Sequence, residues 1–351
     1  DSSRALTNLD KIQVPADMWR TPSQYRDWHP VRLPNCCIDW RTNEAKESVM
    51  GEVDVRYCGP GMEYTPDDLK GAIRDMGGDM VLVGDSVTRL WNGELKCYLG
   101  ARNAPDAAEE KDTFLRDMME RFLKYSPEWR KLVDLNTFGK PSYFKIPAEA
   151  EDVPTQRVMY LPFTGRTSSG MEMNLALMEY LNDQYPLDFS RQRPFFVINI
   201  GLHYNRQDGL EEDYRIDMKT LILHCRKLGA RCIFRETTPQ YWDTPQKDGS
   251  YPGVENATGC FQKTKKSFGI LTNWRNDVMY SALKECESLG LEEGGLVEVM
   301  PLFKKLEGLN GKHVRRSEDC THLACDANNW EPYHVSLTET LIGISNAKTA
   351  V

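Results

Sequence analysis

Ser86 is the residue of this chain best placed for nucleophilic chemistry. It follows the apolar run Met80–Val83 and the pair Gly84-Asp85, and apolar residues at helical spacing come after it. This pattern predicts a buried strand, a tight turn and a helix that begins near Ser86. Open α/β sheets keep their ligand crevices at this edge, and a helix N-terminus stabilises a developing oxyanion. A serine becomes a nucleophile only when a base is oriented toward it.

A base and a carboxylate to orient it occur together near the end of the chain. Asp319 and His322 lie three positions apart, after the last expected strand and before the last expected helix. In a short turn, the carboxylate would hold one ring nitrogen while the other takes the serine proton. One alternative is that Asp319 caps the turn and His322 packs beside it. Another is a metal site made by Cys320, His322 and Cys325, but that spacing lacks the paired knuckle of zinc sites, so we expect no metal and no cofactor.

Polar groups also follow the strongest strand pattern, Phe195–Ile200. Gly201 and His203 come directly after it, followed by Tyr204 and Asn205. Groups at the end of a central strand are well placed to stabilise an oxyanion or to bind substrate. An ordinary turn from strand to loop is the alternative.

Apolar β-rich runs alternate with helical patterns along the chain. Strands are expected at Met80–Val83, Val158–Leu161, Phe195–Ile200, Arg231–Arg235 and Leu296–Met300. Helices are expected from Val87, over 109–135, Met171–Tyr185, Glu211–Leu228 and Asn273–Leu289, and from about Glu331. The alternation predicts an α/β fold with a parallel sheet covered on both faces.

Two segments near the start lack this pattern. Residues 1–30 are expected to form an extended stem or wrapping arm. Residues 31–75 contain Cys36, Cys37 and Cys58 and are expected to be an irregular segment that flanks the sheet. Residues 31–351 as a whole are expected to form one catalytic domain.

Composition excludes some classes of partner. The 351 residues carry a net charge of −8, which argues against binding nucleic acid or an anionic membrane surface. No apolar run is long enough for a membrane span, and no signal-peptide core is present. Because the first residues are polar, we expect any targeting segment or membrane anchor of the full-length protein to lie outside this chain.

The cysteines indicate an oxidising compartment. The chain has ten cysteines, and Asn256-Ala257-Thr258 is a glycosylation sequon in a polar loop. Both features favour disulfides over scattered free thiols, and they predict a secretory lumen such as the Golgi, or the outside of the cell. His224 and Cys225 fall within a helical pattern and are expected to pack in the core.

Four blocks, in this order, resemble the PC-esterase family of the SGNH hydrolase superfamily, and especially its trichome birefringence-like polysaccharide O-acetyltransferases. Residues 84–89 resemble the G-D-S-x-x-R block, and residues 199–204 are similar to N-T-G-H-W with Leu202 inserted. Residues 234–239 resemble F-R-T-x-S-P. Residues 319–325, followed by Trp330, are similar to D-C-S-H-W-C with one extra residue between the cysteines. The resemblance covers about residues 58–340.

This resemblance implies a three-layer α/β/α, SGNH-like (flavodoxin-like) domain with a disulfide-stabilised flanking lobe. It implies Ser86 as nucleophile, His322 as base and Asp319 as its orienter. Gly201 and His203 are implied as oxyanion or substrate groups. Further candidates for substrate contact are Arg89, for which a structural role is favoured, and Tyr204, Asn205 and Trp242. Trp91 and Trp330 are expected to be core residues.

The expected reaction is a double displacement through an acyl-serine. An acetyl donor acylates Ser86, and a hydroxyl of a polysaccharide or oligosaccharide then takes the acetyl group. A secreted carbohydrate acetylesterase would use the same residues with water as acceptor. A non-catalytic glycan-binding protein on the same scaffold is the third alternative.

Overall fold

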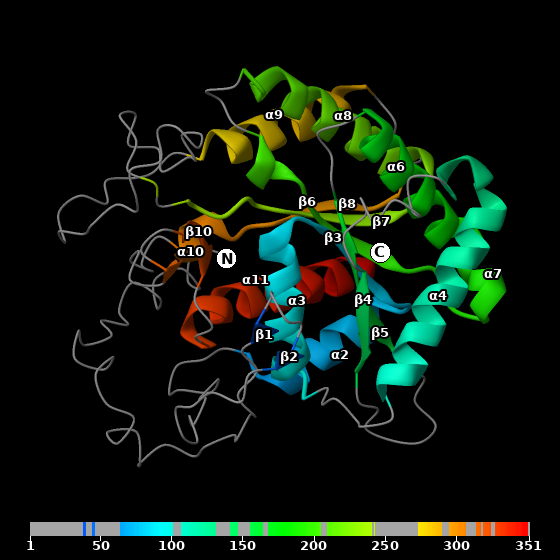
Figure 1. Cartoon of the computed structure of the whole chain (residues 1–351). Coiled ribbons are helices and arrows are strands. Elements are labelled where there is room, and N and C mark those ends of the chain that lie inside the picture. Colours follow the sequence, from blue (N-terminus) through cyan, green and yellow to red (C-terminus); the bar gives the residue numbers. More distant parts are fainter. Residues whose placement is uncertain are drawn as a thin grey trace, which may run out of the picture.

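The core of the structure is a six-stranded mixed sheet with the order β4-β5-β3-β6-β7-β8 (Figure 1). Its strands are β3 (Met80–Gly84), β4 (Ser142–Lys145), β5 (Arg157–Pro162), β6 (Phe195–Asn199), β7 (Arg231–Arg235) and β8 (Val297–Met300). All pairs are parallel except β4 with β5. The computed structural model describes residues 38–39, 44–45, 64–100, 107–130, 141–146, 155–163, 168–204, 209–240, 242, 273–289, 295–306, 314–316, 319–323 and 327–349.

Helices cover both faces of this sheet, so the described chain has three layers (Figure 1). One face carries α4 (Ala107–Tyr125), α6 (Ser168–Asp183), α8 (Glu211–Lys227) and α9 (Trp274–Ser288). The other face carries α2 (Pro66–Met76), α3 (Ser86–Tyr98) and α11 (Ala327–Thr349). Short elements are β1 (Ile38–Asp39) with β2 (Glu44–Ala45), η2 (Pro127–Trp129), α7 (Tyr185–Phe189), η3 (Gly201–His203), α10 (Phe303–Leu306), and β9 (Val314–Arg316) with β10 (Asp319–Leu323). None of the helices in the described ranges is both long and apolar enough to cross a bilayer.

The strand residues explain why the sheet lies between two helix layers. Along β3, Val81 and Val83 belong to the core under α4, α6, α8 and α9, whereas Met80 and Leu82 belong to the core with α2, α3 and α11. Successive side chains of a strand point to opposite faces, so a continuous apolar run buries both faces. The predicted α/β class is confirmed, with the correction that the sheet is mixed rather than wholly parallel.

The strand order fixes where a crevice can form. Numbered along the chain, the parallel strands lie in the order second, first, third, fourth, fifth. The order therefore reverses between β3 and β6, and ligands of open α/β sheets bind outside the carboxyl ends of the strands at such a switch point. Ser86 directly follows β3, and Gly201 follows β6.

Several boundaries differ from the sequence prediction. Residues 66–76 form α2, so the last ten residues of the segment expected to be irregular are helical, and Thr65 and Asp68 begin this helix with a capping box. The spacing of Thr65 and Asp68 is a helix-start signal that can be recognised in the sequence. Strand β4 was not predicted, and α11 begins at Ala327 and accommodates Pro332, where a start at Glu331 was expected. Helix α4 ends at Tyr125, before Pro127 and η2, so the expected helix over 109–135 is interrupted there, and its residues 131–135 lie outside the described ranges.

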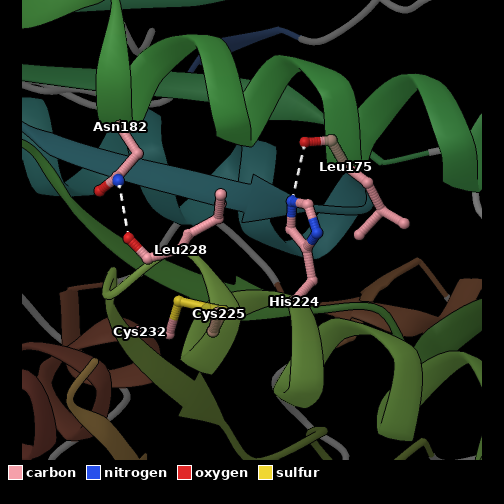
Figure 2. Close-up of a disulfide and its surroundings, with 6 residues drawn as sticks. All are labelled: Leu175, Asn182, His224, Cys225, Leu228 and Cys232. Carbon is pink, nitrogen blue, oxygen red and sulfur yellow. Dashed lines mark hydrogen bonds between the residues drawn. A yellow bond between two sulfur atoms is a disulfide. The ribbon is translucent and has the colours of Figure 1, made fainter. Parts of the chain in front are cut away.

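A disulfide joins the end of α8 to the start of β7 (Figure 2). Cys225 is bonded to Cys232, so this expected packing residue is also a covalent link. His224 donates from Nε2 to the Leu175 carbonyl, and the Asn182 amide donates to the Leu228 carbonyl, both at 3.0 Å. These bonds tie α6, α8 and β7 together at one end of the sheet. Cys286 is a buried free thiol.

The buried histidine of α11 predicts an acid-sensitive fold. His334 stacks on Tyr98 with ring centroids 4.2 Å apart, and burial lowers its pKa to about 3. The unfolded chain therefore binds this proton more readily, and the free energy of unfolding should fall by about 1.4 kcal/mol for each pH unit below 6.5. His334→Phe keeps a stacking ring that cannot be protonated. Urea unfolding between pH 7.5 and 5 should show a shallower pH dependence for this variant, and equal slopes for both proteins would contradict the prediction.

Candidate active site

The turn that presents Ser86 is capped by the residue before it. Asp85 is buried, and its Oδ1 accepts hydrogen bonds from the N–H groups of Val87 (3.0 Å) and Thr88 (3.3 Å). Aspartate is among the preferred N-cap residues because it satisfies these first-turn donors. Helix α3 therefore begins at Ser86, as predicted, and Ser86 is half-buried. Because Asp85 already occupies the Val87 and Thr88 N–H groups, those two groups are not available to an oxyanion.

The neighbouring strand β5 stabilises the same turn through a hydroxyl group. The Tyr160 hydroxyl on β5 lies 3.2 Å from the carbonyl oxygens of both Gly84 and Asp85. A side chain at Gly84 would overlap Thr88 Oγ1 and would bring its Cβ to 2.8 Å from the Asn199 carbonyl oxygen. The turn is thus packed on two sides, and only glycine fits at its start.

A buried cation lies beneath the first turns of α3. Arg235, at the end of β7, is 1% exposed, and its Nη2 donates to Thr88 Oγ1 at 3.0 Å. Its guanidinium also lies 5.6 Å from the centre of the Trp91 ring and 5.4 Å from that of Tyr333. Asp85 is the oppositely charged buried group at the same helix end. The predicted core positions of Trp91 and Trp330 are confirmed, at 0% and 1% exposed.

The end of β6 is tied to the end of β7. The Asn199 amide donates to the Arg235 carbonyl at 2.8 Å and to Thr237 Oγ1 at 3.0 Å. Gly201 is buried in η3, where a Cβ would overlap Thr237 Oγ1. His203, at the end of η3, is exposed. The strand ends that carry Ser86 and Gly201 are therefore parts of one packed edge.

Leu202, between Gly201 and His203, is 7% exposed and belongs to the core shared with α3. Its side chain is buried while that of His203 reaches the surface. Leu202 therefore has a packing role in η3.

Tyr204 packs inward from this edge. It is 2% exposed, and its hydroxyl donates to Asp217 on α8. Burial and this hydrogen bond raise the pKa of Tyr204. Its carbonyl accepts from Arg275 Nε and Nη2 at 3.0 and 2.6 Å. Tyr204 is therefore a buried structural residue and not a substrate contact. Arg89, by contrast, is exposed on α3.

The acid and base expected from the sequence lie on a strand that contacts the serine helix. Asp319 and His322 are part of β10, which pairs with β9 and contacts α3. A short turn was expected here, so the local structure differs from the prediction, and the register of the β9–β10 pair is irregular between Asp319 and Leu323. The side chains of Asp319 and His322 lie outside the described part of the chain, as do Asn205 and the Asn256 sequon.

The described residue between that acid and base is Thr321. Its hydroxyl accepts hydrogen bonds from Gln240 Nε2 at 3.1 Å and from Trp242 Nε1 at 3.0 Å. Trp242 is 9% exposed, so its ring mainly packs within the core. At the carboxyl end of the sheet, β10 therefore contacts both α3 and the segment after β7, which are far from it in the sequence.

Several residues that shape this edge were not identified from the sequence. Asp85 had a recognisable signal, because an aspartate directly before a helical pattern is a typical N-cap. Arg235 is a charged residue at the end of an apolar strand, and the sequence does not show its partner. Gln240 and Thr321 lie 81 positions apart and carry no local signal of their contact.

Comparison with known proteins adds no relative to this description. Searched against family models, curated proteins and solved structures, the chain matches none.

Proposed function

We propose that this protein is a polysaccharide O-acetyltransferase that carries the acetyl group on Ser86. One observation carries the proposal. Helix α3 begins with Ser86 at the carboxyl end of a central strand, and it contacts β10, the strand that contains Asp319 and His322. A nucleophile, a base and a carboxylate drawn from distant parts of a chain are the parts of a Ser-His-Asp triad.

The arrangement of the sheet supports an SGNH-like, flavodoxin-like domain. The order of the parallel strands is that of flavodoxin-like sheets. The sequence blocks at 84–89, 199–204 and 234–239 fall at the carboxyl ends of β3, β6 and β7, and the fourth block falls on β10. Blocks that are scattered along the sequence are expected to meet at one edge if they serve one site.

In the proposed first half-reaction, Ser86 Oγ attacks the carbonyl carbon of the acetyl donor while His322 takes the hydroxyl proton. The bond from the carbonyl carbon to the donor's leaving group breaks, and the leaving group receives that proton. In the second half, a sugar hydroxyl gives its proton to His322 and attacks the acetyl-serine. Ser86 Oγ then leaves and recovers the proton, while Asp319 holds the histidine ring in the required tautomer.

The oxyanion of each tetrahedral intermediate needs donors from the same edge. The N–H of Ser86 and groups near Gly201 are our candidates, since Asp85 occupies the next two N–H groups of α3. His203 is exposed beside Gly201 and is our candidate for contact with the glycan.

We also propose that the protein works in the secretory lumen or outside the cell. The Cys225–Cys232 disulfide supports this, since structural disulfides persist in oxidising compartments. Further disulfides in the flanking lobe and a glycan on Asn256 belong to the same proposal.

Acetyl capture tests the reaction directly. The protein is incubated with 4-nitrophenyl acetate, and intact mass is recorded for the wild type and for Ser86→Ala. We expect an acetyl adduct on the wild type alone, because only the hydroxyl of Ser86 is activated. Absence of an adduct under rapid-quench conditions, together with no release of nitrophenol above the Ser86→Ala level, would contradict the covalent mechanism.

The fate of the acetyl group distinguishes transfer from hydrolysis. The acetylated protein is mixed with xylan- or glucan-derived oligosaccharides or with buffer, and acetylated sugar and free acetate are quantified. We expect acetyl-oligosaccharide to form at the expense of acetate. Release that no oligosaccharide changes would make the protein an acetylesterase. Saturable glycan binding without any Ser86-dependent chemistry would make it a binding protein.

A further inference from the structure

One hydroxyl connects the β10 strand to the segment that follows β7. Thr321 Oγ1 accepts from both Gln240 Nε2 (3.1 Å) and Trp242 Nε1 (3.0 Å). Both donors come from well-buried side chains, 3% exposed for Gln240 and 9% for Trp242. A hydroxyl oxygen has two lone pairs, so a single side chain satisfies two donors that would be costly to leave unpaired.

The segment that supplies these donors is itself held firmly. The Thr237 N–H donates to Asn276 Oδ1 at 2.7 Å, and its carbonyl accepts from Asn273 Nδ2 at 2.6 Å, both at the start of α9. Glu236 accepts from the N–H groups of Leu302 and Phe303 at 2.6 Å each. The chain after β7 is therefore anchored to α9 and to the residues after β8 before it reaches Gln240.

The anchored hydroxyl lies beside the proposed base. Thr321 is adjacent to His322 and two residues from Asp319 on β10, and β10 contacts the helix that begins at Ser86. We propose that Gln240, Trp242 and Thr321 form a positioning unit that sets β10, and with it the backbone of His322, relative to α3. This inference rests on the proposed function. It makes Trp242 a positioning residue that acts through Thr321, where the sequence had suggested a substrate contact.

The unit gives a specific kinetic expectation. Thr321→Val preserves the shape of the side chain but removes the acceptor, so β10 loses these two hydrogen bonds to the anchored segment. A displacement of about 1 Å between reacting groups costs on the order of 100-fold in rate. We expect Thr321→Val to lower kcat for 4-nitrophenyl acetate by about 10- to 100-fold with little change in KM, and Thr321→Ser to restore it.

The matched control makes the same substitution elsewhere. Thr338 is buried in α11, where its hydroxyl donates to the His334 carbonyl at 2.8 Å. Thr338→Val removes one buried hydroxyl without touching β10, so it should change the melting temperature and leave kcat near the wild-type value. If Thr321→Val does not fold, Trp242→Phe and Gln240→Met each remove one donor, and each should lower kcat at constant KM.

The outcomes separate this inference from the proposed function. A wild type with no turnover above Ser86→Ala overturns both. A Ser86-dependent wild type whose Thr321 and donor variants keep wild-type kcat overturns the positioning unit alone. A kcat loss that Thr321→Ser fails to restore, or that Thr338→Val reproduces, also overturns it. A loss confined to kcat and restored by serine supports it.

Discussion

Replacing Ser86, His322 or both by alanine is expected to lower turnover by nearly the same factor, on the order of 10⁶. The reason is that a nucleophile and its base act as one unit, so removing either abolishes the shared step. Asp319→Ala should cost less, about 10⁴, because the carboxylate only orients the ring and stabilises its charged form. Steady-state rates with 4-nitrophenyl acetate, measured for the three single variants and the double variant, test this directly.

Non-additivity is the decisive feature of that measurement. If the loss in the double variant equalled the product of the two single losses, Ser86 and His322 would act independently and the triad would be wrong. Far-ultraviolet circular dichroism of each variant verifies that the fold is retained. A non-additive loss in the double variant would also show that His322 and Ser86 act together, in agreement with the contact between α3 and β10.

Gly84→Ala is expected to cause a large loss of stability. The new Cβ would lie 2.8 Å from the Asn199 carbonyl oxygen and would overlap Thr88 Oγ1. Gly84 lies between β5 and β6 in the sheet, so the backbone has little freedom to move away. Overpacking of this kind costs about 3 kcal/mol, which urea unfolding measures. The same change should slow acetylation of Ser86, because Gly84 and Asp85 form the turn that precedes it.

The control for this substitution is another glycine to alanine change. Gly71 lies within α2, and nothing approaches the position of its added Cβ within 4 Å. Gly71→Ala should therefore stabilise the protein by about 0.5–1 kcal/mol, since alanine favours a helix interior. If both variants unfolded at the wild-type urea concentration, the packing described around Gly84 would be incorrect.

The sequence predicted the parallel strands well, and four of them, β3, β5, β6 and β7, are buried on both faces. Such strands are continuous apolar runs, and Arg231–Arg235 matches β7 at both ends. The edge strand β4 was not predicted because Ser142–Lys145 is short and only partly apolar. The expected turn at 319–322 is a strand because β9 pairs with it, and such pairing depends on partners that periodicity does not reveal.

Local sequence determined that a serine follows a strand and begins a helix. Some hydrogen bonds, such as those that the Asp85 cap accepts, join residues close together in the sequence. Such bonds can be predicted from the local residue types. The residue types and spacing of Asp319 and His322 made them candidate partners, but no local rule joins them to Ser86. That step depends on which strands become neighbours.

Only the tertiary structure decided what surrounds Ser86. The order of the strands puts β3 beside β6 and so creates the switch point, and the contact of α3 with β10 joins the two ends of the chain. Arg235 beneath α3 and the hydroxyl of Thr321 between Gln240 and Trp242 are long-range contacts of the same kind. The physical reason is that burial and hydrogen bonding reward whichever groups meet in space, whereas periodicity reports only which face of its own element each residue occupies.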